Sequence, residues 1–220
     1  MAQTIEHLVH EVEAGRCVGI EITNTTNMTF RSPRTFCFSG HTLTPPTPII
    51  HPNNAGFCIF VKRKFSLRGS VGLLVYEIED QTLAIMFSNP FDYNFFKVEF
   101  AVALSGYKEE TQDLKAFFEL LYHEKQKGWL KMAKEKLCEC QCPVSLENNG
   151  IRVTATMSNN AKAIIKLSSP DAKPPEGDVA DVQPTTVRRP NPPPFPSPRP
   201  RIGSDLTGDQ LATLDFESGK

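Results

Sequence analysis

Three alternating cysteines are the clearest candidate metal ligands in the sequence. Cys138, Cys140 and Cys142 form the stretch "CECQC". Alternate residues of a strand project from the same face, so the three thiols would lie together and could hold a soft metal. However, no histidine or cysteine pair elsewhere has the spacing of a zinc site. We therefore expect the six cysteines to be free thiols that pack as small core residues.

Histidines near the N-terminus are a second candidate for metal binding. His7, His10 and Glu11 lie close together in "TIEHLVHEVEA" at a spacing that metals use, but the sequence offers no third ligand and a solvated polar face explains them better. The chain also contains no G-x-S-x-G, no H-E-x-x-H and no glycine-rich phosphate loop. We expect no enzyme and no cofactor.

The strongest remaining feature is an aromatic cluster around a turn. The stretch "MFSNPFDYNFF" (86–96) holds five rings, and Pro-Phe-Asp-Tyr-Asn is typical of turns. Loops lie at the surface, where a contiguous apolar patch indicates contact with a partner or a membrane. The alternative is that the rings cap one end of the fold and face inward, as alternation with Ser88 predicts for Phe87.

Period-two alternation predicts nine strands around this loop. They cover residues 16–23, 34–40, 56–65, 70–78, 81–88, 96–104, 136–144, 151–157 and 161–168. The stretches "ENNG" and "SNN" are hairpin connections, which join the last three strands into an antiparallel meander. Many short strands with such turns indicate a sandwich or a closed barrel.

Two segments have helical periodicity instead. Residues 109–127 and residues 4–14 each place apolar side chains on one face. These faces consist of Leu114, Phe117, Phe118, Leu121 and Tyr122 in the later segment and of Ile5, Leu8, Val9 and Val12 in the earlier one. The predicted fold is therefore mainly β, a β-sandwich flanked by two α-helices.

The composition changes near Ser169. Eleven of the eighteen prolines fall between Pro170 and Pro200, and such a stretch buries too little apolar surface to offset its chain entropy. We predict an amphipathic helix in residues 1–15, the sandwich in 16–169 and a disordered Pro-rich tail in 170–220. Its P-x-x-P pairs suggest an SH3- or WW-type partner, but no arginine has the spacing of an SH3 ligand and a plain spacer is the simpler interpretation.

The residue order around the aromatic cluster is similar to that of a known family. "SVGLLVY" followed by "FSNPFDYN" resembles the actinoporins, pore-forming cytolysins of sea anemones, in which "VGVLAY" and "FSVPYDYNWY" occupy matching places. The resemblance extends in pattern from about Thr4 to Ser168, and the tail has no counterpart. It implies an actinoporin-like β-sandwich that binds phosphocholine headgroups, preferably of sphingomyelin, and an N-terminal helix that detaches to line an oligomeric cation pore.

The resemblance also implies a set of lipid-binding residues. The phosphocholine positions fall on Ser39, Val71, Ser88, Pro90, Phe91, Phe118, Tyr122 and His123. Aromatic faces suit a quaternary ammonium, at roughly 0.5–2 kcal/mol per ring, and the hydroxyls of Ser39, Ser88 and Tyr122 suit a phosphate. Where the family usually has tyrosine, this chain has two phenylalanines and a histidine, so rings remain and hydroxyls are lost.

Further residues are expected at the membrane interface. Phe95 stands at a position that the family fills with an interfacial tryptophan, Phe96 follows it, and Trp129 lies in the lysine-rich "KGWLKM". Glu99 falls on a second tryptophan position, where a carboxylate is costly to press into an interface. These residues predict a membrane surface as the partner.

The predicted pore helix contains Ile5, Leu8, Val9 and Val12. Residues 4–14 would span about 16 Å at 1.5 Å per residue, whereas the hydrocarbon core is about 30 Å thick. We therefore expect binding to phosphocholine lipids such as sphingomyelin and, from the resemblance, homo-oligomers on membranes. The helix is too short to form a pore unaided.

Charge and hydropathy narrow the remaining choices. The net charge is −1, which predicts no nucleic-acid partner. The N-terminus has no basic region and no apolar stretch of a secretory signal, so we expect a soluble cytoplasmic or unconventionally released protein that acts at a membrane. Two alternatives stay open: a lectin-like glycan-binding module, and an intracellular adaptor that acts through the Pro-rich tail.

Overall fold

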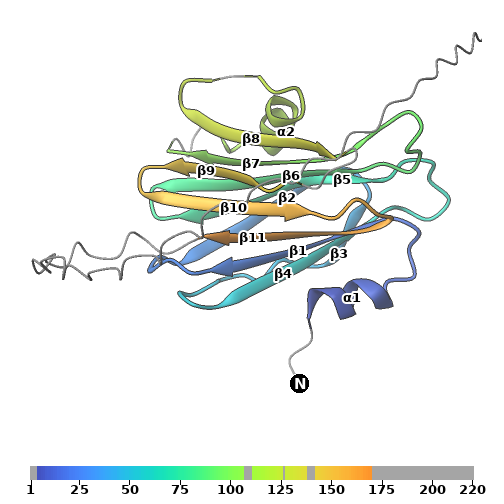
Figure 1. Cartoon of the computed structure of the whole chain (residues 1–220), viewed down its shortest axis with the longest axis horizontal. Coiled ribbons are helices and arrows are strands. Elements are labelled where there is room, and N and C mark those ends of the chain that lie inside the picture. Colours follow the sequence, from blue (N-terminus) through green and yellow to red (C-terminus); the bar gives the residue numbers. More distant parts are fainter. Residues whose placement is uncertain (1–3, 107–110, 126, 138–141, 170–220) are drawn as a thin grey trace, which may run out of the picture. The chain divides into compact units, whose positions relative to one another are not determined.

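Two β-sheets packed face to face form the body of the protein (Figure 1). The structure is a computed structural model that describes residues 4–106, 111–125, 127–137 and 142–169, all within one structural unit. One sheet contains, in spatial order, β3 (His41–Thr44), β4 (Ala55–Val61), β1 (Cys17–Asn24), β11 (Lys162–Ser169), β10 (Ile151–Met157) and β9 (Val144–Asn148). The other contains β2 (Phe30–Ser39), β5 (Ser70–Ile78), β6 (Gln81–Asn89), β7 (Val98–Ser105) and β8 (Leu130–Leu137). The two helices are α1 (Ile5–Glu11) and α2 (Leu114–Tyr122).

A tight turn and antiparallel pairing organise the last three described strands. Strands β9, β10 and β11 are antiparallel neighbours, which confirms the predicted meander. Asn149 and Gly150, between β9 and β10, both have positive φ, as a tight hairpin turn requires. Strand β11 then pairs in parallel with β1, with Cys17 opposite Lys162, so the first and last strands lie side by side.

The main core fills the space between the sheets. Phe60 of the first sheet and Phe87 of the second meet with ring centroids 4.6 Å apart. Every residue of β6 and β7 is buried, because one face of these strands meets the opposite sheet while the other lies under α2. The predicted inward position of Phe87 is confirmed.

Several predicted strand limits were wrong. Residues 136–144 do not form one strand: β8 ends at Leu137, and β9 begins at Val144. Strand β8 instead covers "LKMAKEKL", which alternation did not reveal because its apolar and charged residues do not follow a period of two. Strand β3 was also missed, since its four residues are too short to show a period.

Helix α1 packs on the first sheet, but it is shorter than predicted and ends at Glu11. The Thr4 hydroxyl caps its start by accepting from the amide of His7, and Lys162 Nζ donates to the carbonyl of His10 at its end, 2.7 Å away. Of the residues predicted for a pore helix, Ile5, Val9 and Val12 are buried against the sandwich and Leu8 is partly buried.

A glycine in β1 makes room for this helix. A Cβ atom at Gly19 would lie 2.4 Å from Val9 Cγ2, so a larger residue would push the helix off the sheet. The salt bridge between Glu6 and Lys166 adds an electrostatic contact at the helix edge. Within the described residues no helix has the length and apolar composition needed to cross a bilayer.

Helix α2 covers the outer face of the second sheet (Figure 1). The carboxylate of Asp113 caps it by accepting from the amides of Lys115 and Ala116 at 3.0 and 3.1 Å. Phe117, Phe118 and Leu121 are buried, as the helical periodicity predicted.

The cysteines that the structure describes differ in burial, and Cys37 is only partly buried. Cys17 and Cys58 are buried free thiols, as expected, and burial raises the pKa of the Cys17 thiol to about 11. Cys142 is exposed, so its prediction as a core residue was wrong. Cys138, Cys140 and the predicted Pro-rich tail lie outside the described residues. The part of the chain that the structure describes contains no cluster of metal-ligating side chains.

Candidate functional site

Two loops meet at one end of the sandwich. The aromatic loop, residues 90–97, joins β6 to β7, and the basic loop, residues 62–69, joins β4 to β5. Both project at the right-hand end in Figure 1, beside the segment that links α1 to β1. Because three segments far apart in sequence converge here, this end of the fold is where a site can be built.

A cavity of about 190 Å³ opens between the two loops, strand β2 and the end of α2. Six of the eight predicted phosphocholine residues line it. The full lining consists of Phe38, Ser39, Leu67, Arg68, Gly69, Val71, Ser88, Pro90, Phe91, Asp92, Phe96 and Tyr122. The fold thus brings residues from four separate stretches of sequence to one cavity.

The other two predicted residues support its aromatic wall from behind. Phe118 is only 3% exposed and stacks on Phe38 and Tyr122, with centroids 5.6 and 5.5 Å away. His123 meets Tyr122 edge to face at 5.3 Å. These two side chains therefore hold the rings that line the cavity. Phe38 was not predicted, although it follows Phe36 on the same face of β2.

Some polar groups of the cavity are already hydrogen-bonded within the protein, whereas others can still bind a ligand. Ser39 Oγ donates to the carbonyl of Gly69 at 2.9 Å, so its proton is used within the protein. Burial, followed by the neighbouring carboxylate of Glu99, raises the pKa of the Tyr122 hydroxyl, which therefore stays protonated and able to donate. Arg68 adds a cation and Asp92 a carboxylate to the same lining. A zwitterionic group could pair with both.

A glycine allows the two loops to approach each other. A Cβ atom at Gly69 would lie 2.0 Å from the carbonyl oxygen of Asn89 and 2.6 Å from the Cα of Pro90. Both neighbours are backbone atoms at the start of the aromatic loop, and backbone cannot yield as a flexible side chain does. The width of the cavity thus depends on a residue without a side chain.

Arg16 holds the aromatic loop from the opposite side. Its Nε donates to the carbonyl of Pro90 at 3.0 Å and its Nη2 to that of Phe91 at 2.8 Å. The guanidinium also lies 4.6 Å from the ring centroid of Tyr93 and 5.5 Å from that of Phe91. Because Arg16 directly follows the linker from α1, one side chain joins that linker to the loop.

A buried amide fixes the base of the aromatic loop. Asn89 is fully buried, and its Nδ2 donates to the carbonyls of Cys17, Asn160 and Ala161 at 3.0–3.2 Å. Its Oδ1 accepts from the hydroxyl of Tyr93 at 2.8 Å. Tyr93 therefore faces inward and anchors the loop, while its neighbours Phe91, Phe95 and Phe96 remain exposed.

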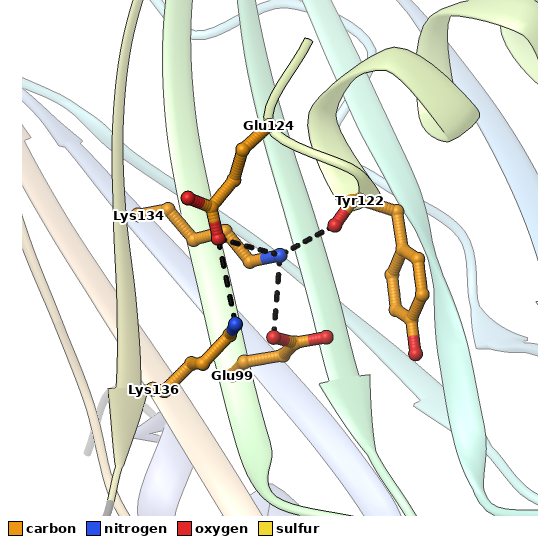
Figure 2. A network of polar contacts seen from close by, with 5 residues as sticks. All are labelled: Glu99, Tyr122, Glu124, Lys134 and Lys136. Atoms are coloured by element: carbon orange, nitrogen blue, oxygen red, sulfur yellow. Dashed lines mark hydrogen bonds and ion pairs between the residues drawn. The ribbon is translucent and has the colours of Figure 1, made fainter.

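An ion-pair network supports Tyr122 (Figure 2). Lys134 Nζ, on β8, donates to the Tyr122 carbonyl at 2.6 Å and lies 3.2 Å from Glu99 Oε2 on β7 and 3.5 Å from Glu124 Oε1. Lys136 lies 3.6 Å from the same oxygen of Glu124. Glu99 is thus buried and paired rather than presented to solvent. The network ties the end of α2 to two strands.

The expected interface residues do not gather in one place. Phe95 and Phe96 are 80% and 60% exposed at the tip of the aromatic loop. Trp129 is partly buried against Phe117, 6.4 Å between centroids. It directly precedes Leu130, which pairs with Ser105 at the far end of β7 from this loop. The structure therefore does not place Trp129 beside the other two.

Comparison with known proteins now identifies the family. A family model described as "Sea anemone cytotoxic protein" matches residues 3–168. The chain belongs to this family. "Hydra actinoporin-like toxin 1" from Hydra vulgaris is 35% identical over 65 residues, which are 30% of this chain and 35% of the relative. "Deep-sea actinoporin Cjtox I" from Cribrinopsis japonica is 31% identical over 101 residues, 44% of this chain and 46% of the relative.

These matches define what the family assignment covers. The matched segments span about a third and just under half of the two relatives, and the family model covers the predicted helix and sandwich but not the tail. The chain is an actinoporin-like member of a family of cytotoxic proteins and is not an enzyme. The resemblance seen in "SVGLLVY" and "FSNPFDYN" is confirmed.

A solved structure shares the fold. The structure entitled "Crystal structure of lipid binding protein Nakanori" aligns with a TM-score of 0.59 at 17% sequence identity, over 74% of this chain and 75% of that one. The actinoporin-like sandwich is thus also found in a protein of very different sequence.

Proposed function

We propose that this actinoporin-like protein binds membranes by taking a phosphocholine headgroup, as in sphingomyelin, into the cavity between the aromatic and basic loops. One observation carries the proposal: a cavity of about 190 Å³ combines exposed aromatic rings with a cation, a carboxylate and a protonated tyrosine hydroxyl. The family of cytotoxic proteins to which the chain belongs supports a target at the cell surface.

The chemistry of the cavity matches both ends of such a headgroup. A quaternary ammonium has no N–H to donate, so it is held by ring faces and carboxylates. Phe91, Tyr122 and Asp92 supply these groups. The phosphate requires donors, and Arg68 and the hydroxyl of Tyr122 provide them in the same lining.

Exposed apolar side chains surround this opening. Phe38, Phe91 and Phe96 are 56%, 40% and 60% exposed within its lining, and Phe95 lies beside them. A soluble protein rarely leaves so many large rings together in water without a binding role. In the proposed complex they lie at the level of the lipid headgroups, where aromatic side chains are favoured.

The proposed activity is binding, and perforation would require more chain than α1. A helix of seven residues spans about 10 Å, against a hydrocarbon core about 30 Å thick. Any pore would therefore need residues flanking Ile5–Glu11 to become helical on the membrane. Leakage of an entrapped dye from sphingomyelin vesicles reports this step separately from binding.

Co-sedimentation with vesicles tests the headgroup proposal. We expect the full chain to pellet with phosphatidylcholine–sphingomyelin vesicles, and Phe91→Ala to weaken binding by about 2- to 30-fold, since one ring contributes roughly 0.5–2 kcal/mol to a held cation. Phe57→Ala is the matched control, because Phe57 is 41% exposed and Phe91 40%, and Phe57 lies on β4 outside the cavity. Equal binding of Phe91→Ala and Phe57→Ala would refute the placement of the site.

A further inference from the structure

The basic loop carries features that phosphocholine binding does not use. Its sequence "KRKFSLRG" (62–69) contains four cations and no acidic residue. Phe65 and Leu67 lie between Lys64 and Arg68 and are 101% and 83% exposed, the two most exposed large apolar side chains in the described part of the chain. Phe65 also has a φ of +59°, which is unfavourable for a bulky residue and directs the backbone away from extended geometry.

Internal hydrogen bonds brace the loop in this shape. Lys62 Nζ donates to the carbonyl of Ser66 at 2.9 Å. The amide of Ser66 donates to the carbonyl of Arg63 at 3.2 Å, and the amide of Arg68 donates to Ser66 Oγ at 3.0 Å. Since these bonds close the turn on itself, the exposed tip is a formed protrusion.

The charges of the loop are not neutralised by neighbours. Among the residues that the structure describes, Lys62, Arg63, Lys64 and Arg68 form no ion pair. A second cavity, of about 560 Å³, is lined by Lys62, Lys64 and Phe65 of the loop and by Glu11 and Glu13 near the end of α1, and none of these lysines is within ion-pair distance of either carboxylate. The net charge of −1 for the whole chain therefore conceals a local cluster of positive charge.

The basic loop adjoins the headgroup cavity. Leu67 and Arg68 line that cavity together with Phe91 and Phe96, and Lys62 Nζ lies 5.1 Å from the ring centroid of Phe91. A surface that approaches lipid through the aromatic loop thus brings the basic loop to the same bilayer. There the cations would face lipid phosphates, while Phe65 and Leu67 would enter the apolar layer beneath them.

We propose that the basic loop is a second lipid-binding site, selective for anionic phospholipids such as phosphatidylserine. The combination of features favours a bilayer over nucleic acid or an acidic protein. Only a bilayer presents a dense layer of negative headgroups directly above an apolar phase, which accommodates both the cations and the exposed pair Phe65 and Leu67. This goes beyond the proposed function, because an anionic headgroup need not contain choline.

The test compares the full chain on three vesicle compositions: phosphatidylcholine alone, with sphingomyelin, and with phosphatidylserine. The variant is Arg63→Gln/Lys64→Gln, in which both side chains are exposed. Its charge-matched control is Lys127→Gln/Lys131→Gln, near the start of β8 at the other end of the sandwich. Each basic residue beside an anionic leaflet raises binding about fivefold at moderate salt.

We expect phosphatidylserine to strengthen binding of the wild-type chain and high salt to remove that gain. The Arg63→Gln/Lys64→Gln variant should lose about 25-fold on these vesicles, keep its sphingomyelin-dependent binding, and retain the wild-type circular dichroism spectrum. The control pair should lose less than about threefold. A Phe65→Ser variant should also weaken anionic binding while leaving net charge unchanged.

Several outcomes would overturn the proposal. One is an absence of any gain with phosphatidylserine while sphingomyelin binding persists, which would leave the headgroup proposal standing. Another is an equal loss in the control pair, which would show only a general charge effect. A third is wild-type binding to RNA or heparin that exceeds binding to anionic vesicles. Conversely, binding to phosphatidylserine but not to sphingomyelin would support this site and refute the phosphocholine cavity.

Discussion

Removing the Arg16 side chain should loosen the aromatic loop without touching the cavity itself. Arg16 is half-buried at the start of β1, does not line the cavity, and holds the loop through two backbone carbonyls and one inward-facing ring. In Arg16→Ala the carbonyls of Pro90 and Phe91 lose their charged donor. Because Pro90 is buried, its carbonyl has limited access to water as a replacement.

The size of this effect follows from the contacts. A hydrogen bond from a charged donor contributes about 1.5–3 kcal/mol when buried, and partial exposure of Arg16 lowers each of the two to about 1–1.5 kcal/mol. The cation over the ring of Tyr93 adds about 0.5–1 kcal/mol. Together the free energy of unfolding should fall by about 3 kcal/mol, which corresponds to about 6–12 °C in Tm for a chain of this size.

Thermal unfolding followed by circular dichroism measures the loss, and co-sedimentation with sphingomyelin vesicles measures its consequence. Arg16→Lys should recover roughly half of the stability, since an ammonium keeps the cation–ring contact but lacks the planar fork that reaches two carbonyls. Arg152→Ala is the control: its guanidinium pairs with Glu147 on an exposed surface, worth about 0–1 kcal/mol. If Arg16→Ala lowers the free energy of unfolding no more than Arg152→Ala does, the contacts of Arg16 with Pro90, Phe91 and Tyr93 do not stabilise the aromatic loop.

Two further predictions concern helix α1. The buried Cys17 thiol packs beneath α1 and has a pKa raised to about 11, so peptide mapping should find it unlabelled by maleimide in solution and labelled once the protein is unfolded in urea. Labelling of Cys17 in the presence of vesicles would show that α1 has left the sheet. Leakage of an entrapped dye without such labelling would contradict pore formation through release of α1. The salt bridge to Lys166 lowers the pKa of Glu6 below its ordinary 4.5. Its contribution is therefore present above pH 4.5 and lost as the pH falls through the lowered pKa, so the difference in urea midpoint between wild type and Glu6→Gln should shrink over that range. If the difference in urea midpoint stays constant over this pH range, the Glu6–Lys166 salt bridge does not stabilise the fold.

Local patterns determined most of the fold in advance. Alternation located the strands whose two faces differ in polarity, and Asn149–Gly150 marked a hairpin because both residues must adopt positive φ. Strand β8 escaped notice because its Lys134 is buried in an ion pair with Glu99, so a charged residue occupies a buried position on the face covered by α2. The parallel pairing of β1 with β11 could not be predicted either, since nothing in one strand encodes its distant neighbour.

The aromatic loop was visible in the sequence as a ring-rich turn, but the residues that complete the cavity were accessible only through the family resemblance. Six of its residues were named in this way, but they lie on separate strands and loops, and spacing alone gives no reason to join Ser39 to Tyr122. Phe38 was missed because alternation assigns it a face of β2 without showing that it stacks on Phe118 of α2 at the cavity. Arg68 and Arg16 were missed for a different reason: a single arginine in a polar segment carries no pattern, and its role depends on what the fold places opposite it.

The structure gives a physical reason why this chain can have phenylalanine where the family usually has tyrosine. Phe118 lies behind the cavity at 3% exposure, where a hydroxyl would have to be buried, so its ring supports Phe38 and Tyr122 by stacking alone. In the proposed complex, Arg68 in the cavity lining would supply the phosphate donor that the missing tyrosine hydroxyls cannot. A charged donor binds a phosphate oxygen about twice as strongly as a neutral one, but it also binds anionic lipids that lack choline. In the proposed complexes, Arg68 would therefore let the cavity accept negatively charged headgroups as well as choline lipids, and the adjoining basic loop would strengthen that preference.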